Sequence, residues 1–223
     1  MSIDVAVRRA QVYRFLADAF LYTTEDWTQD LPLLSEALRE LNAPVLELEV
    51  SSPGAAALRA EHRRVFGLTG SLCYETEYGL PHEFRQSQEL ADLAGFYRAF
   101  GFTLGGPVHE RPDHAAAELE FMYALTLKEA QAAESGFDDQ VEVCADAERK
   151  FLGAHLATWI DLFAEALERL AAQGPYVRLA RFAAAFVRSD AERLGLAWEP
   201  RPLQTVKPTP LGPELPCEGC GAL

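Results

Sequence analysis

Two apolar helical patterns flank one charged turn between Ser87 and Glu134. In the first pattern, apolar residues recur every three or four positions: Leu90, Leu93, Ala94, Tyr97 and Phe100. The second pattern has the same spacing at Leu119, Met122, Tyr123 and Thr126. This period is helical, whereas strands alternate from one residue to the next. The sequence therefore predicts two helices joined through the turn Glu110-Arg-Pro-Asp-His114, with other elements packed around them.

The rest of the chain carries further segments of helical spacing. They are predicted over residues 4–22, 30–42, 53–67, 139–172 and 175–194, the fourth being either one helix or two that meet near Gly153. Ser87 is a good N-cap and Gly101 a good stop for the first helix of the central pair, and Pro112 suits the first turn of the second. Gly67 to Arg85 has no lasting period, so we expect a long loop there, a feature that tends to be functional.

The predicted fold is all-α: a single-domain helical bundle over residues 1–198, followed by a Pro-rich tail over residues 199–223. Six prolines between positions 200 and 216 exclude regular structure from that tail, which we expect to be extended or disordered. Hydrophobic content of 49% is enough for one globular core in 223 residues.

Charge and composition exclude several classes of function. A net charge of −14 argues against nucleic acid, because phosphate binding needs a basic surface. The longest all-apolar run, Phe182 to Val187, is far too short to cross a membrane, and no signal peptide is evident. The four cysteines are too scattered for a disulfide scaffold, which indicates a cytoplasmic protein.

No established catalytic or metal-binding motif is complete in the sequence. Glu-x-x-His pairs, His-Glu-x-x-His, phosphate-binding glycine loops and nucleophile elbows are all missing, so no cofactor is predicted. His114 and Glu118 stand four apart and can share a helix face, but two ligands do not make a metal site. Cys217 and Cys220 form a C-x-x-C pair on the tail, a weak candidate for zinc or redox chemistry.

Asp113 and His114 allow two interpretations. Asp113 would lie in the first helical turn, where the helix dipole favours a carboxylate, and His114 would be an incidental surface residue. Alternatively, the acids Glu110, Asp113, Glu118 and Glu120 gather around His114 as a patch for a basic peptide. Apolar anchors for such a peptide would come from nearby aromatic residues: Phe96, Tyr97, Phe100 and Phe121.

The run Glu110-Arg-Pro-Asp-His114, followed by Glu118-Leu-Glu-Phe-Met122, closely resembles the signature of the TorD/DmsD/NarJ-like chaperones, the redox-enzyme maturation proteins. The resemblance covers most of the chain. It also includes the helix from Arg9 to Phe20, the helix from Glu89 to Phe102, the His155-Leu-x-x-Trp159 segment and the closing helix from Tyr176 to Asp190. The C-x-x-C tail is not part of this signature.

The resemblance implies a cytoplasmic chaperone and not an enzyme. Its partner would be the apo catalytic subunit of a molybdenum bis-guanylyl-pterin oxidoreductase, often bound through its twin-arginine leader, until the cofactor is inserted. Asp113 and His114 would be the central partner-binding pair, supported by Glu110, Pro112, Glu118, Tyr97 and Phe121. The sequence of residues 110–122 is most similar to that of members serving the dehydrogenase and nitrate, chlorate or selenate reductase branch of that enzyme family. Some members are said to bind guanine nucleotides, but the sequence has no loop for one.

Two other classes stay open at the level of sequence. One is a metal-dependent helical enzyme that uses His114, Glu118 and the C-x-x-C pair. The other is a stable structural subunit of an oxidoreductase. The sequence leaves both monomer and dimer open, since the linkers 101–111 and 134–138 would allow domain swapping.

Overall fold

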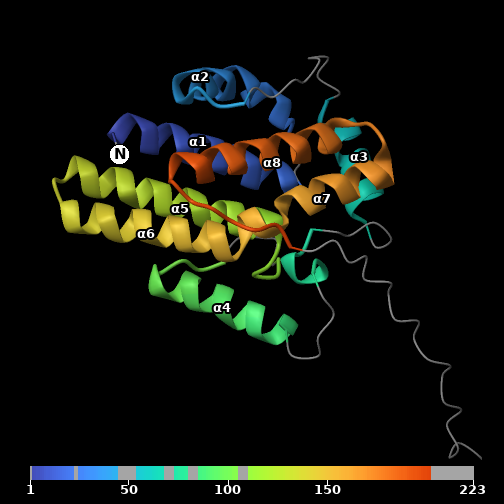
Figure 1. Ribbon diagram of the computed structural model, residues 1–223. Helices are drawn as coiled ribbons and strands as arrows, with labels where there is room; N and C mark the ends of the chain where they lie inside the picture. Colours follow the sequence, from blue (N-terminus) through green and yellow to red (C-terminus); the bar gives the residue numbers. More distant parts are fainter. Residues whose placement is uncertain are drawn as a thin grey trace, which may run out of the picture.

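The computed structural model describes residues 2–22, 25–44, 54–67, 73–79, 85–104 and 110–201 (Figure 1). Within these ranges the chain forms eight α-helices and two short 3-10 helices, with no strand, which confirms the all-α prediction. The elements are α1 (Ile3–Phe20), η1 (Trp27–Asp30), α2 (Leu31–Leu41), α3 (Ala55–Phe66), η2 (Glu75–Glu77), α4 (Arg85–Ala99), α5 (Ala115–Glu134), α6 (Asp138–Ala154), α7 (Leu156–Ala171) and α8 (Pro175–Arg193).

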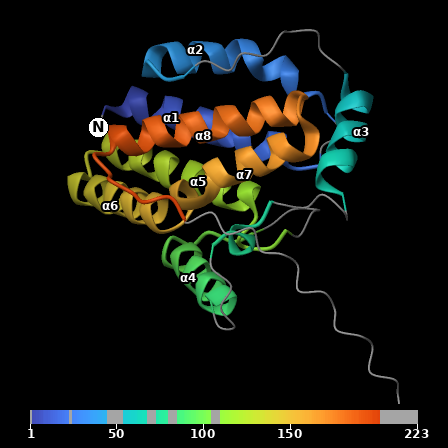
Figure 2. The same cartoon turned by 45° about the vertical axis from the view of Figure 1, so that its right-hand side comes forward.

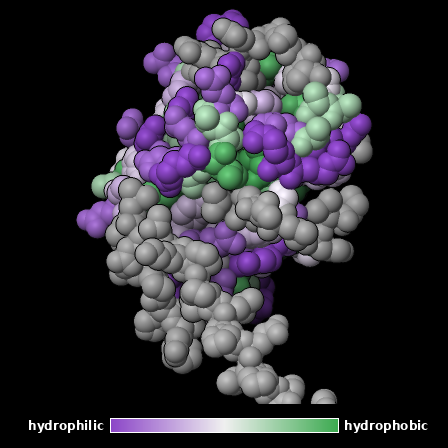
Figure 3. Space-filling view, turned by 90° about the vertical axis from the view of Figure 1, so that its right-hand side faces the viewer, coloured by the Kyte–Doolittle hydropathy of each residue, from purple (hydrophilic) through white to green (hydrophobic). Residues whose placement is uncertain are grey.

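The helices are arranged as a layered bundle around α1 and α5, which pack together over most of their lengths. Helix α6 pairs with α5 and α7 with α8, while α2 covers α1 on the outer side (Figures 1 and 2). Helix α4 lies at the opposite edge, and only Leu93 and Tyr97 among its side chains are fully buried. Viewed from the α3 end, hydrophilic side chains surround a smaller hydrophobic area (Figure 3). None of the described helices has the length and apolar character to cross a bilayer.

A charged cluster joins four helices inside the core. Arg9 of α1 has no exposed surface and binds Asp190 of α8 through Nε and Nη2, at 2.7 and 2.8 Å. The same guanidinium reaches Glu148 of α6 at 2.5 Å and Glu129 of α5 at 3.2 Å, and the Tyr13 hydroxyl donates to Asp190 at 2.8 Å. Because a buried charge is costly without partners, this cluster fixes how the four helices meet.

The stretch predicted over residues 139–172 is two helices. His155 separates α6 from α7 with φ −123° and ψ −98°, outside the helical region. The break lies two residues beyond Gly153, which stays inside α6. A Cβ added at Gly153 would lie 3.2 Å from Leu196 Cδ1, in the segment that follows α8, so the Leu196 side chain would have to shift slightly to accept it.

Helix α5 begins later than the sequence predicts. Pro112 and Asp113 precede it, and its N-cap is His114, in an extended conformation. The reason is long-range: residues 113–115 pair with residues 73–75, through Glu75 N to Asp113 O and Ala115 N to Cys73 O, each at 2.8 Å. The first turn therefore cannot include Pro112, and the prediction that Asp113 caps the helix is wrong.

Other boundaries differ by a few residues. Helix α4 spans Arg85–Ala99 and so includes Ser87, the expected cap, and its first residue, Arg85, donates to the carbonyls of Thr76 and Tyr78. Gly101 follows its end at φ +64°, as a helix stop requires. The expected loop over residues 67–85 contains η2. Beyond Arg201 the expected tail, with Cys217 and Cys220, lies outside the described residues.

Candidate functional site

The charged turn 110–114, which was predicted to carry function, packs against the segment 73–79. Tyr74 and His114 form an isolated antiparallel bridge, and η2 follows it directly. Tyr74 also donates to Glu110 Oε2 at 3.3 Å, and the Arg111 guanidinium lies 4.5 Å above the Tyr74 ring. The turn and the loop segment therefore form one structural unit at the start of α5.

Asp113 is the polar centre of that unit and is completely buried. Its Oδ2 accepts hydrogen bonds from Thr76 Oγ1 at 2.7 Å and Thr76 N at 3.4 Å. Arg111 binds both oxygens, through Nε to Oδ1 at 3.0 Å and Nη2 to Oδ2 at 2.8 Å. A bidentate pair of this kind fixes geometry as well as charge. Asp113 therefore ties the turn to η2 and does not face solvent.

His114 is buried too, with 6% of its surface exposed. Its Nδ1 accepts a hydrogen bond from Ala116 N at 3.1 Å, which makes the imidazole the cap of α5. Burial lowers the pKa of His114 to about 4, although the nearby carboxylates of Glu110 and Asp113 act in the opposite direction. The imidazole is therefore neutral near pH 7, which the capping acceptor requires. The prediction of an incidental surface histidine is wrong.

Aromatic rings fasten α4 to this unit. The Tyr97 hydroxyl donates to the carbonyl of Pro112 at 2.7 Å, and its ring lies 4.8 Å from that of Phe121 in α5. Phe96 packs edge-on against Phe151 and His155 at the α6–α7 junction. Tyr97 and Phe121 are buried, so they support the site from beneath and are not free anchors for a peptide.

A second set of buried polar groups lies beside Asp113. Glu118 has no exposed surface; its Oε2 accepts from the indole of Trp159 at 3.1 Å, and its Oε1 has no hydrogen-bond partner among the described residues. Burial, followed by the charge of Glu75, raises the pKa of Glu118 well above its usual value. Glu75, also fully buried, lies 3.1 and 3.2 Å from Nδ1 of His155. On the solvent side, Asp92 Oδ2 lies 3.2 Å from His155 Nε2.

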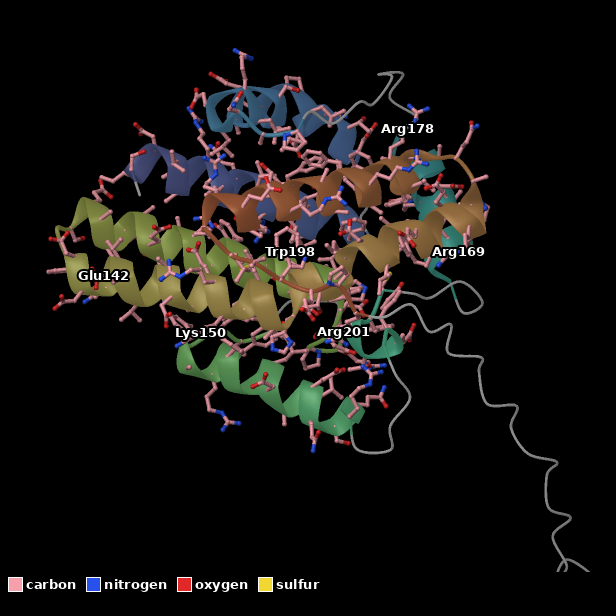
Figure 4. The ribbon with its side chains drawn as sticks, viewed as in Figure 1. Glu142, Lys150, Arg169, Arg178, Trp198 and Arg201 are labelled. Atoms are coloured by element: carbon pink, nitrogen blue, oxygen red, sulfur yellow. The ribbon has the colours of Figure 1, made fainter. Side chains whose placement is uncertain are left out.

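Arg201 completes this set from the segment after α8. Its guanidinium binds the carboxylate of Glu75 and lies 3.1 Å from Glu89 Oε1. It also donates to Thr158 Oγ1 at 3.0 Å and to the carbonyl of Tyr78 at 3.1 Å. In Figure 4 Arg201 lies near η2 and the edge of α4, where the extended chain ends its course across the bundle.

The predicted site residues thus meet at one end of α5, but most of them are interior. Asp113, His114, Glu118, Tyr97 and Phe121 are buried, while Glu110 and Pro112 are half-exposed. The sequence interpretation missed Glu75, Thr76 and Arg201. The first two lie in a loop without periodicity, and the third lies in the expected tail. The one available signal was the long loop itself.

The described residues include no group of three or more His, Cys, Asp or Glu side chains arranged to hold a metal ion. His114 uses Nδ1 for capping, and its neighbour in sequence, Asp113, is engaged by Thr76 and Arg111. The alternative metal site built on His114 and Glu118 therefore has no support in this geometry, and Cys217 and Cys220 lie beyond the described residues.

The chain belongs to the nitrate reductase delta subunit family, which it matches over residues 24–165. That range includes η2, α4, the turn 110–114 and the α6–α7 junction, so it covers every element of the site except the segment carrying Arg201. The resemblance to reductase maturation chaperones is confirmed at the level of the family.

The chain is similar to several proteins named as chaperones, some of them as reductase assembly chaperones. The perchlorate reductase assembly chaperone protein of Dechloromonas aromatica (strain RCB) is 35% identical over 105 residues, 47% of this chain and 46% of the relative. The chlorate reductase assembly chaperone protein of Ideonella dechloratans is 31% identical over 144 residues, 64% of this chain and 72% of the relative. The chaperone protein TorD of Vibrio cholerae serotype O1 (strain ATCC 39315 / El Tor Inaba N16961) is 31% identical over 106 residues.

The chain spans about half the length of the Dechloromonas and Vibrio relatives, 46% of each. The Ideonella relative is covered more fully. No solved structure matches the chain.

Proposed function

We propose that this protein is a chaperone that assembles one molybdenum-containing reductase by binding its catalytic subunit before that subunit is complete. The observation that carries the proposal is the family match over residues 24–165, together with relatives named as perchlorate and chlorate reductase assembly chaperones. The chain acts by binding and not by catalysis. Residues 1–198 would form the chaperone domain, with the remainder as its tail.

The binding face is the exposed rim of the site. Glu110 and Pro112 are half-exposed, Arg111 is 41% exposed in its side chain, and Asp92 on α4 is 64% exposed. Asp113 and His114 act as positioning residues, because their hydrogen bonds hold the turn and η2 in place from within. Mixed charges on this rim suit a polar, reversible contact with a client.

The finer steps follow from the same proposal. The client is held open until its molybdenum cofactor is inserted, in the cytoplasm, and its twin-arginine leader is one segment that the chaperone binds. Helix α4 is suited to such a role. It has few fully buried side chains and is fastened chiefly through Tyr97, Arg85 and the contacts of Asp92 and Phe96.

A second candidate function is a permanent subunit of the reductase. The observation that favours it is the description of the family itself, nitrate reductase delta subunit. The two candidates differ in one measurable respect. A subunit stays with the mature, cofactor-loaded enzyme, whereas a chaperone leaves it.

The direct test is affinity capture of the protein from its native host, with mass spectrometry of bound proteins and molybdenum analysis of the eluate. We expect a reductase catalytic subunit that carries no molybdenum. Because Asp113 and His114 are buried, alanine at either would disturb the fold, so the variant is Glu110→Lys on the rim. Glu134→Lys, exposed at the far end of α5, is the matched control.

Capture should fall in Glu110→Lys and persist in Glu134→Lys. Equal capture of the subunit by both variants would show that the binding face lies elsewhere than at the rim. Capture of molybdenum-loaded enzyme at constant stoichiometry would favour the permanent subunit. Metal bound by the protein itself, without a reductase, would contradict both.

A further inference from the structure

Beyond α8 the chain crosses the α6–α7 junction as an extended segment, residues 196–201, which we call the strap (Figure 4). Three residues attach it: Leu196 packs over Gly153, Trp198 is half-buried against the core, and Arg201 enters the site. Ala197, Glu199 and Pro200 are exposed. Along residues 197–201 the one backbone hydrogen bond found in the described part of the chain joins Arg201 N to Thr158 O, at 2.9 Å. The strap is therefore held by the packing of Leu196 and Trp198 and by the polar contacts of Arg201.

The pocket that receives Arg201 is built entirely from other elements. Its walls are Glu75 and the carbonyl of Tyr78 in the η2 segment, Glu89 on α4 and Thr158 on α7. A guanidinium presents five N–H donors in a plane, and these acceptors surround it. The strap thus supplies the cation, and the η2 segment, α4 and α7 supply the acceptors.

Arg85 also binds Glu89 and the carbonyl of Tyr78, so Glu75 is the group of the pocket that depends most on Arg201. Glu75 has no exposed surface, and without Arg201 the imidazole of His155 would be its one remaining side-chain partner among the described residues. Glu118, buried next to it, has an oxygen without a partner among the described residues. An ammonium group is a compact, strongly hydrated charge, whereas a guanidinium can bind carboxylates and carbonyls in one plane.

A groove with several charged side chains adjoins the pocket. It is large enough to accommodate an extended segment of a second polypeptide. It has a volume of about 710 Å³ and lies between α7 and α8, with Pro200 and Arg201 of the strap at its edge. Asp161, Glu165 and Glu168 line it, and Arg181 and Arg188 pair with two of these acids. An extended polypeptide could replace the strap and continue along this groove.

We propose that the pocket is a receptor for an arginine side chain of the client polypeptide, and that Arg201 occupies it in the free chain. The proposal rests on the proposed function only for the identity of the partner. An incoming arginine takes the place of Arg201 on Glu75 and Glu89, the strap leaves the α6–α7 junction, and Trp198 is released. The chain thus masks its own pocket until a client is present.

The test uses acetyl-arginine amide as the probe and the indole N–H signals of the tryptophans in NMR spectra as the readout. The proteins are the wild type, Arg201→Gln and the matched control Arg64→Gln, which removes the same charge at a 52% exposed position on α3. In the wild type Arg201 already occupies the pocket, so only a small fraction of the molecules can bind the probe. The apparent affinity for the probe is lowered in proportion to that fraction. We expect Arg201→Gln to bind the probe at least about tenfold more tightly than the wild type and Arg64→Gln.

Acetyl-lysine amide and acetyl-citrulline amide should bind none of the three proteins measurably, and adding Glu89→Gln to Arg201→Gln should abolish the gain. Equal affinity of the wild type and Arg201→Gln for the probe would overturn the proposal. If Arg201→Gln does not fold, Trp198→Ala takes its place, because it loosens the strap and keeps every group of the pocket. It should also bind more tightly than the wild type, and an unchanged affinity there would overturn the proposal equally. No client is used, so failure leaves the chaperone function untested and intact.

Discussion

At the scale of single residues, the buried cluster around Arg9 sets an electrostatic condition on the fold. One guanidinium faces the carboxylates of Asp190, Glu148 and Glu129 in a space without solvent. Burial raises the pKa of Glu148 to about 7, although Arg9 lowers it and Glu129 adds to the rise. The folded protein therefore holds a proton there that the unfolded chain has already lost at the same pH.

The first prediction concerns the pH dependence of stability. Because the folded pKa of Glu148 lies above the unfolded value, its contribution is present below about pH 4.5 and is lost as pH rises through about 7. Glu148→Gln keeps a neutral side chain at every pH. Relative to the wild type, we expect its free energy of unfolding to improve by about 1–3 kcal/mol between about pH 5 and about pH 8.

Urea unfolding followed by circular dichroism measures this difference at each pH. The difference between the two proteins removes the contribution of His114, whose lowered pKa acts in the opposite direction. Glu134→Gln, exposed on the same bundle, is the control and should follow the wild type throughout. Parallel curves for Glu148→Gln and the wild type would show that Glu148 is ionised in the folded state across this range.

At the scale of elements, the bond between Asp113 and Thr76 decides whether the segment 73–79 stays on the bundle. Asp113→Ala removes the acceptor of Thr76 and of Arg111, and we expect a loss of about 2–4 kcal/mol of stability. Hydrogen exchange should accelerate first in residues 73–79 and in α4. Helices α1 and α8, which meet through Arg9, should keep their protection.

Arg14→Ala is the control for that experiment, since Arg14 is a 48% exposed residue that pairs with Asp18 on the surface of α1. Its exchange pattern should match the wild type, because exposed pairs contribute little. If hydrogen exchange in Asp113→Ala accelerated uniformly over the whole chain, the segment 73–79 and the bundle would unfold as one unit.

Two glycines give opposite predictions for the same substitution. Gly95 lies exposed inside α4 with no atom near an added Cβ, so Gly95→Ala should stabilise the protein by about 0.5–1 kcal/mol. Gly136, in the turn between α5 and α6, has φ +71° and equally open space. Gly136→Ala should cost about 1 kcal/mol through the backbone alone. Thermal unfolding measures the change in stability in each variant. If the two changes had the same sign, the assignment of α4 or of the turn would be wrong.

Local spacing was sufficient to predict the helices, because the face that each helix buries recurs within its own sequence. The α6–α7 break was left open because the apolar spacing continues through it, and the groups that His155 contacts at the break, Glu75 and Asp92, are distant in sequence. The same limit applies to the turn 110–114. Its extended form depends on pairing with residues 73–75, so Asp113 was placed in a helix that begins after it.

The candidate site was chosen from its sequence motif, and the burial of most of its residues was not predicted. In a chain with 34 acidic residues, local sequence cannot distinguish Glu75, Glu118 and Glu148 from solvated carboxylates. Their partners, His155, Trp159 and Arg9, come from other helices. The acidic patch expected around His114 is therefore mostly an internal network, of which Glu110 is a half-exposed member.

At the scale of the whole molecule, the bundle combines a rigid part with a loosely attached edge. Helices α1, α5, α6 and α8 share the buried charge cluster, whereas α4, the segment 73–79 and the strap meet at the candidate site. A client that binds this edge can rearrange α4 and the strap without opening the core. This arrangement suits temporary binding better than permanent assembly.

Under the proposed function, the protein holds an incomplete reductase subunit and releases the finished one. The most direct measurement is the affinity of the purified chain for its captured catalytic subunit, prepared without and with the molybdenum cofactor, by isothermal titration calorimetry. We predict binding to the cofactor-free subunit and affinity at least about tenfold weaker for the loaded one, as a coupling of more than about 1.4 kcal/mol requires. Equal affinity for the two forms would contradict the chaperone account and favour a permanent subunit.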